Sequence, residues 1–366
     1  MKKFKIASLF SGIGGFEEGI RLTGIPHEIV FASEIDRFAQ KSYSANFGET
    51  NLFGDITKIK AEDIPNHDLV IAGFPCQSFS IAGKRKGFDD IRGTLFFDLV
   101  RVLVAKKPQY IILENVKNLV GHDRTNTIKT ILKTLNDIGY TVDFSVVNSF
   151  EAGVPQNRDR TYIVGILGYP SEKFEIDFRN IKVSQLKNEL NTKKFYGFNF
   201  FNNLKFSNEK RYIEDILEKN VSEKYYFNTK KINNFVKEIK IQEIEKNEDR
   251  IVKLFDIPRE VHNDLERQRR VYSVKGISPT VLARSDSTKI CTFDCGLIRV
   301  RKVTPEENFY IQGFSKEFVE SIKRKGISDT QMYKQSGNAV SPPVIEGIFK
   351  EIHSIDQKRG RIESDR

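Results

Sequence analysis

The stretch Asp68-Leu69-Val70-Ile71-Ala72-Gly73-Phe74-Pro75-Cys76-Gln77 decides which fold class this chain can adopt. Its apolar run from Leu69 to Ala72 is typical of a buried strand in an α/β sheet. Such folds bind ligands in the crevice beyond the carboxyl ends of their strands. Cys76 follows the strand at this end, so its thiol is a candidate nucleophile. The alternative is a small buried apolar residue, which is the usual role of a free cysteine.

The segments around this strand repeat the pattern of short apolar strands and helix-length stretches as far as about residue 170. The expected strands are Lys5–Leu9, His27–Ala32, Leu69–Ala72, Tyr110–Glu114, Thr141–Asn148 and Thr161–Leu167. The stretches between them have apolar residues at three- and four-residue spacing, which predicts helices over Gly15–Leu22, Arg37–Phe47, Phe96–Ala105 and Thr127–Ile138. This alternation predicts an α/β fold with a doubly wound, mostly parallel sheet.

The composition of the chain changes at about residue 175, where a segment rich in Lys, Asn and Glu, with interleaved aromatic residues, begins. We expect an α/β domain over residues 1–175, a smaller inserted domain over 176–295, a return to the first domain over 296–353 and a disordered tail over 354–366. Apolar spacing from Lys230 predicts one helix in the insertion. The cationic cluster from Arg267 to Arg270 fits either a solvated surface or a phosphate contact.

Composition narrows the class of protein further. The 366 residues carry a net charge of +10, which favours a polyanionic partner. Three cysteines are an odd number for a disulfide framework and too few for a four-thiolate zinc site, and the five histidines are scattered, so we expect no metal site. The chain lacks an apolar run of about 18 residues and a signal-peptide pattern at its start, so we expect a cytoplasmic protein without a membrane helix.

The first expected strand leads into Phe10-Ser11-Gly12-Ile13-Gly14-Gly15, a glycine-rich turn at the cofactor position of Rossmann-type folds. The spacing differs from Gly-x-Gly-x-x-Gly, and therefore suits a nucleoside cofactor without a pyrophosphate, such as S-adenosylmethionine. Glu34 ends the second strand, where a carboxylate can accept hydrogen bonds from ribose hydroxyls. Asp55 could accept a hydrogen bond from the adenine amino group. Each feature also occurs in turns and strand ends that bind nothing.

Two further elements suggest chemistry at the same sheet edge. Glu114 ends the expected strand that begins at Tyr110, and Arg158 and Arg160 alternate in Gln156-Asn157-Arg158-Asp159-Arg160, which places them on one face if the segment is extended. A free thiol needs a base or cationic neighbours to react at neutral pH. Methylation of carbon 5 of a cytosine uses such a set, because a thiolate adds at carbon 6 while a carboxyl group binds N3 and the exocyclic amine.

The chain resembles the cytosine-C5 DNA methyltransferases of bacterial restriction-modification systems. The resemblance covers both ends of the chain and leaves out the middle. Its seven collinear stretches are Phe10–Gly15, Gly73–Ser80, Arg92–Phe97, Glu114–Val116, Gln156–Arg160, Arg301–Phe314 and Gln335–Val340. The resemblance implies a sheet of the S-adenosylmethionine-dependent methyltransferase type, with catalytic residues in 1–175 and a target-recognition domain in 176–295.

The resemblance also implies a role for individual residues. The catalytic set is Cys76 as nucleophile, Glu114 as the acid at N3, and Arg158 and Arg160 as contacts of the target cytosine and the catalytic loop. The residues implied to bind S-adenosylmethionine, whose product is S-adenosylhomocysteine, are Phe10, Gly12, Gly14, Gly15, Glu34, Ile35, Asp55, Ile56, Pro75, Leu95, Asn338 and Ala339. Those implied to contact DNA are Gln77, Ser80, Lys84, Arg85, Lys86 and Thr280, most of them in a loop over residues 77–94 that closes over a flipped base.

The implied partners are double-stranded DNA and a cognate restriction endonuclease, and the implied assembly is a monomer. One departure is Glu306, which stands where the family usually has an arginine that orders the recognition domain. Two alternatives remain open: a tRNA cytosine-C5 methyltransferase and a catalytically inactive DNA-binding regulator. The sequence does not predict the DNA sequence that is recognised, because no direct code relates the amino acids of a recognition domain to the bases that they contact.

Overall fold

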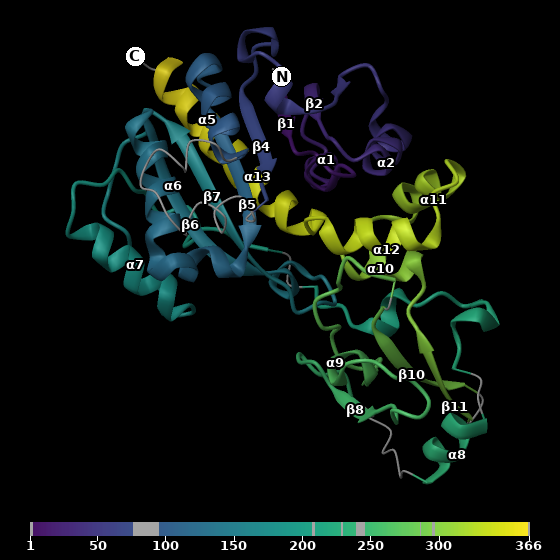
Figure 1. Ribbon diagram of the computed structural model, residues 1–366. Helices are drawn as coiled ribbons and strands as arrows, with labels where there is room; N and C mark the ends of the chain where they lie inside the picture. The colour runs from purple at the N-terminus through teal and green to yellow at the C-terminus, as the bar shows by residue number, and fades with distance from the viewer. Residues whose placement is uncertain are drawn as a thin grey trace. The chain divides into compact units, whose positions relative to one another are not determined.

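The computed structural model describes residues 3–75, 95–206, 209–227, 230–238, 246–285, 287–294 and 297–364 (Figure 1). The chain divides into two compact units. The first comprises Met1–Val147, Asp159–Lys205 and Val344–Arg366, and the second comprises Asn148–Arg158 and Phe206–Pro343.

Within its described residues, the first unit contains a sheet with the strand order β3-β2-β1-β4-β5-β7-β6. The strands are β1 (Phe4–Leu9), β2 (His27–Ser33), β3 (Leu52–Phe53), β4 (Leu69–Gly73), β5 (Tyr110–Val116), β6 (Tyr140–Asn148) and β7 (Asp159–Leu167). The first five strands pair in parallel, and β7 runs antiparallel to β5. This confirms the predicted mostly parallel sheet.

The helices of the first unit cover both faces of the sheet. They are α1 (Gly15–Leu22), α2 (Arg37–Phe47), α5 (Leu95–Lys106), α6 (Asn126–Asp137), α7 (Ile181–Asn191) and α13 (Pro342–Ser364, shared with the second unit), with 3-10 turns η1 (Ile56–Lys58), η2 (Ala61–Asp63) and η3 (Lys117–Thr125). One core joins α5, α6 and α7 to the inward residues of the central strands, such as Val70 and Ile111. On the other face, Phe349 of α13 packs edge-on against Phe4, with ring centroids 5.3 Å apart.

The limits of the compact units differ from the predicted domain limits. Residues 176–205 belong to the first unit, because Val183, Leu186 and Leu190 of α7 pack into its core. Residues 296–343 belong to the second unit. The predicted disordered tail over 354–366 is helical as far as Ser364, and the Tyr110 hydroxyl donates a 2.7 Å hydrogen bond to Asp356 in this part of α13.

The second unit contains a described sheet with the order β11-β10-β9-β8. Its strands are β8 (Lys253–Asp256), β9 (Arg270–Ser273), β10 (Lys289–Asp294) and β11 (Leu297–Lys302). Its helices are α8 (Lys230–Glu238), α9 (Glu266–Arg269), α10 (Pro305–Ile311), α11 (Lys316–Arg324) and α12 (Asp329–Asn338), with 3-10 turns η4 (Ser149–Ala152), η5 (Ile213–Ile216) and η6 (Glu223–Tyr225). Helix α8 confirms the helix predicted from Lys230, and its Ile232 and Val236 pack on the sheet with the buried thiol of Cys291.

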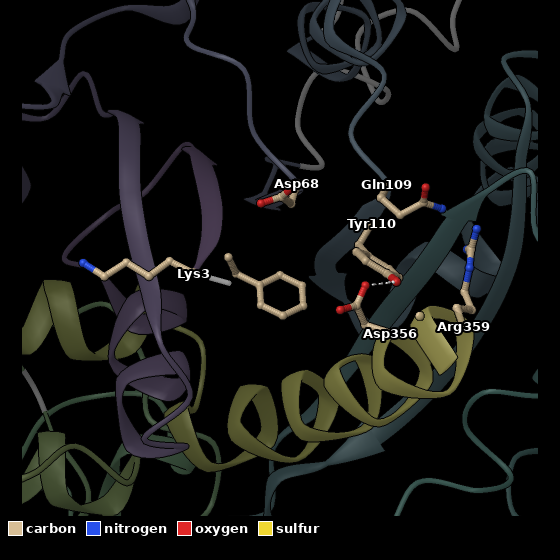
Figure 2. A pocket seen from close by; sticks show the side chains of 8 residues that line it. Lys3, Asp68, Gln109, Tyr110, Asp356 and Arg359 are labelled. Carbon is tan, nitrogen blue, oxygen red and sulfur yellow. Dashed lines mark hydrogen bonds between the residues drawn. The ribbon is translucent and has the colours of Figure 1, made fainter. Parts of the chain in front are cut away.

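A hollow of about 430 Å³ opens in the first unit at the amino ends of β1, β4 and β5 (Figure 2). It is lined by Lys3, Phe4, Asp68, Gln109, Tyr110, Asp356, Arg359 and Gly360. These strand ends are opposite to the carboxyl ends, where open α/β sheets bind their ligands. The hollow is therefore not the candidate active site. In the described part of the chain, no helix has the length and apolar character to cross a membrane.

A buried ion pair fixes α7 on the sheet. Lys187 Nζ lies 2.7 Å from Asp143 Oδ1, with side chains 4% and 0% exposed. The other carboxylate oxygen accepts 2.9 Å hydrogen bonds from the amides of Phe200 and Phe201. Burial raises the pKa of Asp143, and the neighbouring Lys187 opposes this rise. The pair therefore joins β6, α7 and the segment after α7.

We predict that Lys187→Met lowers the free energy of unfolding by about 3–5 kcal/mol, because it leaves the Asp143 carboxylate buried without its cation. The double variant Asp143→Asn/Lys187→Met recovers most of this loss, since the neutral amide that replaces the carboxylate can still accept a backbone hydrogen bond. Urea denaturation at neutral pH measures both. The exposed pair Lys133–Asp137 is the control, and Lys133→Met changes stability by less than about 1 kcal/mol. Equal instability of the single and double variants contradicts this account.

Candidate active site

The carboxyl ends of β1 to β5 form one edge of the sheet, here called the carboxyl edge. Parallel pairing places the residues that follow these strands together at this edge. They are Phe10 after β1, Glu34 after β2, Asp55 after β3, Pro75 after β4 and Glu114 at the end of β5. Cys76 itself lies outside the described residues, as do Gln77, Ser80, Lys84, Arg85 and Lys86.

The turn between β1 and α1 has a backbone that requires glycine. Gly12 and Gly14 have φ values of +57° and +91°, in the left-handed region that other residues seldom adopt. A Cβ atom on Gly14 would also lie 2.2 Å from Cε2 of Phe47. The turn therefore packs directly on α2, which leaves no room for a side chain at Gly14.

Glu34 fixes this turn to the start of α2. Its Oε2 atom accepts a 2.8 Å hydrogen bond from the amide of Gly12, and its Oε1 atom accepts one of 2.8 Å from the amide of Asp36. Each carboxylate oxygen retains a lone pair for a further donor. The next side chain, Ile35, is 70% exposed and presents an apolar surface beside this carboxylate.

Asp55 and Ile56 contribute differently from each other. The Oδ1 atom of Asp55 accepts hydrogen bonds from the amide and hydroxyl of Thr57, at 3.0 and 2.7 Å, and these bonds lower the pKa of Asp55. The lowered pKa favours the ionised carboxylate, which accepts hydrogen bonds and donates none. The side chain of Ile56 is 3% exposed and packs in the core of the first unit, so Ile35 and not Ile56 presents its side chain at the carboxyl edge.

These residues fit S-adenosylmethionine chemically. Its ribose hydroxyls and adenine amino group are donors, which match the carboxylates of Glu34 and Asp55. Half-buried Phe10 and Leu95 and exposed Pro75 and Ile35 offer apolar surface for the adenine ring. The two remaining predicted contacts belong to the second unit, where Asn338 is exposed and Ala339 is 9% exposed.

Glu114 is held by a neighbouring strand. Arg160 Nε of β7 lies 3.1 Å from Glu114 Oε1, and the two side chains are 16% and 13% exposed. The carboxyl group lies beside the end of β4, because a Cβ atom on Gly73 would be 3.4 Å from Glu114 Oε2. The structure thus brings Glu114 and Arg160 together at the carboxyl edge, beside Gly73, which precedes Cys76 by three residues.

Asn115 is a site residue to which the sequence analysis assigned no role. Its side-chain amide donates a 2.8 Å hydrogen bond to the carbonyl of Phe74, and its Oδ1 atom accepts one of 2.9 Å from the amide of Val116. Asn115 is 3% exposed. It therefore ties the end of β5 to the backbone that leads into Cys76.

Arg158 has a different environment from Arg160. It belongs to the second unit, is 1% exposed, and donates hydrogen bonds from Nη2 to the carbonyls of Gly337 and Ala339, at 3.0 and 2.9 Å. The alternation of the two arginines therefore does not give them the same partners. Arg158 anchors the end of α12, whereas Arg160 orients the Glu114 carboxyl group.

Thr280 joins the same part of the second unit. Its hydroxyl donates a 2.7 Å hydrogen bond to the carbonyl of Asn157, whose amide donates one of 2.8 Å to Ser278. A Cβ atom on Gly337 would lie 2.3 Å from the carbonyl carbon of Leu282, so α12 packs closely on the stretch that follows Thr280. The structure thus gathers three separate predicted segments, at residues 156–158, 278–280 and 337–339.

Glu306, the departure from the family pattern, is paired with a cation. Its Oε1 atom lies 2.5 Å from Nζ of Lys323 on α11. The adjacent Glu307 forms a buried two-point pair with Arg301, at 2.6 and 2.8 Å. Among the described residues there is no group of three or more His, Cys, Asp or Glu that could hold a metal ion.

Comparison with known proteins identifies the family. The model of the C-5 cytosine-specific DNA methylases matches residues 4–354. The chain belongs to this family. It is 37% identical over 367 residues to the type II methyltransferase M.SsoII of Shigella sonnei, covering 96% of this chain and 80% of that one. It is 33% identical over 441 residues to the orphan methyltransferase M.SPRI of Bacillus phage SPR, covering 98% and 99%.

A solved structure shows the same fold. The Entamoeba histolytica methyltransferase EhMeth matches with a TM-score of 0.68 and 19% identity, over 97% of this chain and 99% of that one. The family and the relatives make this chain a DNA cytosine-5-methyltransferase. Its mostly parallel sheet is that of the S-adenosylmethionine-dependent methyltransferases.

We predict that Asn115→Ala lowers kcat by about 10²-fold, because the backbone before Cys76 loses its anchor and misplacement of a reacting group by about 1 Å has such an effect. Steady-state kinetics and thermal unfolding measure activity and folding separately. The control is Gln109→Ala, which removes a 2.8 Å side-chain bond to the carbonyl of Leu167. A fully folded Asn115→Ala variant with the kcat of the wild type refutes the anchoring role.

Proposed function

We propose that the enzyme transfers the methyl group of S-adenosylmethionine to carbon 5 of a cytosine within a short, specific sequence of duplex DNA. The observation that carries this proposal is the Glu114 carboxyl group, which Arg160 orients beside the end of the strand that leads to Cys76. An acid fixed at this point suits a base that is attacked by the thiol of Cys76, which follows the neighbouring strand in the sequence.

In the proposed reaction, the Cys76 thiolate forms a bond to carbon 6 of the cytosine, while Glu114 hydrogen-bonds N3 and the exocyclic amine. The electrons of the activated ring then form the bond from carbon 5 to the methyl group. The cofactor supplies that methyl group as an electrophile and leaves as S-adenosylhomocysteine. Loss of the carbon 5 proton and cleavage of the bond between sulfur and carbon 6 return the thiolate. Arg160 keeps the acid in place throughout.

Duplex DNA reaches this site by base flipping in our proposal, because carbon 6 is stacked inside the helix; extrusion costs a few kcal/mol. In this proposal the basic segment that contains Gln77, Ser80, Lys84, Arg85 and Lys86 contacts the DNA, as does Thr280. We assign target recognition to the insertion. In its cationic cluster, Arg269 donates to the carbonyl of Ile257 and Arg270 pairs with Glu266, and Arg267 is exposed.

The cellular role that we propose is protection of DNA from a cognate restriction endonuclease, by a monomeric cytoplasmic enzyme. The relative from Shigella sonnei is named a type II methyltransferase, which supports this role. The phage relative is named an orphan methyltransferase, so a genetic test is needed. Bisulfite sequencing of plasmid DNA from cells that express the enzyme gives the recognition sequence, and digestion with endonucleases of that specificity tests protection.

We predict that the enzyme incorporates labelled methyl groups into duplex DNA and not into tRNA. Cys76→Ser abolishes incorporation, and Glu114→Gln lowers kcat by about 10²-fold or more, because a neutral amide cannot supply the acid. Cys291→Ser is the control: burial raises the pKa of the Cys291 thiol to about 12, and the variant keeps full activity. Incorporation into tRNA alone supports the RNA alternative, and DNA binding without methylation supports the inactive regulator.

We also predict a steep salt dependence of DNA binding, because the net charge of +10 favours contacts with phosphates. Neutralisation of about six phosphates lowers affinity roughly 10³-fold between about 50 and 200 mM salt. Fluorescence anisotropy with a labelled duplex measures this slope. An affinity for DNA that is independent of salt rules out a phosphate-based interface.

A further inference from the structure

Glu17 is a buried carboxyl group that the proposed reaction does not use. It lies in the first turn of α1, two residues after Gly15, and is 0% exposed. The hydroxyls of Ser8 on β1 and Tyr43 on α2 face it, and these residues are 1% and 2% exposed. The three side chains meet where β1, α1 and α2 pack together.

This cluster contains polar atoms without good partners. Both carboxyl oxygens of Glu17, the hydroxyl of Ser8 and the hydroxyl of Tyr43 have no partner at hydrogen-bond distance and angle. Among the described residues, no cation pairs with Glu17, whereas the adjacent Glu18 pairs with Arg21 at 2.8 Å. A buried, ionised carboxyl group without a cation is costly.

The neutral form of Glu17 is therefore favoured. Burial raises the pKa of Glu17 from its usual 4.5 to about 7, and the nearby hydroxyls of Ser8 and Tyr43 oppose this rise. Because the folded protein holds the proton more tightly than the unfolded chain, stability falls as the pH rises from 4.5 through about 7.

Residues of the cluster lie on both sides of the glycine turn in the sequence. Ser8 precedes Phe10 by two residues, and Glu17 follows Gly15 by two. The Tyr43 ring packs against Phe47 with centroids 5.0 Å apart, and Phe47 is the side chain that excludes a Cβ atom from Gly14. A change in the charge of Glu17 would therefore reach Tyr43 and Phe47, the residues through which α2 packs against the turn.

We propose that Glu17 is a positioning residue for S-adenosylmethionine, which holds the turn from Phe10 to Gly15 in its binding conformation while its carboxyl group is neutral. Ionisation draws water toward the carboxylate, separates α1 from α2 and displaces the turn. The inference rests on the proposed function, since it takes this turn as the cofactor site. The side chains that face Glu17 from the neighbouring elements are Ser8 on β1 and Tyr43 on α2, and the next residue on its own helix, Glu18, is paired with Arg21.

Calorimetric titration of the full-length enzyme with S-adenosylmethionine, from about pH 6 to about pH 8.5, tests the inference. We expect the ratio of the Kd of the wild type to that of Glu17→Gln to rise about tenfold over this range, since a coupling of one pKa unit changes affinity tenfold. Because both proteins bind the same cofactor, any effect of its ionisation on Kd cancels in this ratio. The control is Glu18→Gln, which removes a carboxyl group paired with Arg21 and leaves Glu17 and its neighbours unchanged, so we expect its Kd to vary with pH as that of the wild type does. A ratio that is independent of pH overturns the inference.

A second variant covers the case in which Glu17→Gln does not fold. Tyr43→Phe keeps the ring and removes one of the hydroxyls that hold the pKa of Glu17 down. We expect the midpoint of the pH dependence of cofactor affinity to move to higher pH in this variant, and an unmoved midpoint overturns the inference. A wild-type enzyme that does not bind S-adenosylmethionine at any pH overturns the proposed cofactor instead, which distinguishes the two failures.

Discussion

The parallel register of β1, β2, β4 and β5 is the constraint on which the site depends. Leu9 pairs with Ser33 and with Ala72, and Gly73 pairs with Glu114. These pairs end the strands at one level, so the residues that follow them share the carboxyl edge. A slip of one residue would turn every side chain of a strand to the opposite face. The buried apolar residues of these strands exclude such a slip, and they thereby place Glu34 and Glu114.

Polar side chains then fix the loops that leave this rigid sheet, and they do so by bonding to the backbone. In the first unit, Glu34 accepts from the amide of Gly12 and Asn115 donates to the carbonyl of Phe74. The second unit, described by itself, uses the same kind of bond, because Arg158 donates to two carbonyls near the end of α12. Bonds to the backbone hold a loop whatever side chains it carries. A charged donor such as Arg158 also makes stronger bonds than a neutral one. The loops of the site are thus positioned from groups that are themselves buried or half-buried.

Much of the first unit could be predicted from the sequence, because its strands are continuous apolar runs. Each of the six expected strands and four expected helices there ends within two residues of its observed limits. The partners of Asn115 and Arg158 could not be predicted, since they lie 41 and about 180 residues away along the chain. Composition also misplaced residues 176–205. Phe198 and Phe200 look like part of an aromatic insertion, yet they are 3% and 1% exposed and belong to the first unit. Composition does not tell whether an aromatic residue enters a core or a binding surface.

The charges of the molecule match the two unlike substrates of the proposed reaction. The methyl donor carries a positive sulfonium, while the acceptor is a polyanion. The described part of the carboxyl edge presents the carboxylates of Glu34, Asp55 and Glu114, although the chain as a whole has a net charge of +10. Salt screens exposed charges beyond about 10 Å, so the excess positive charge attracts DNA to the protein without cancelling the acidic edge locally. Arg160 is a cation at that edge. Its pairing with Glu114 reduces the local negative charge at the point where the DNA base, and not the cationic cofactor, has to be accommodated.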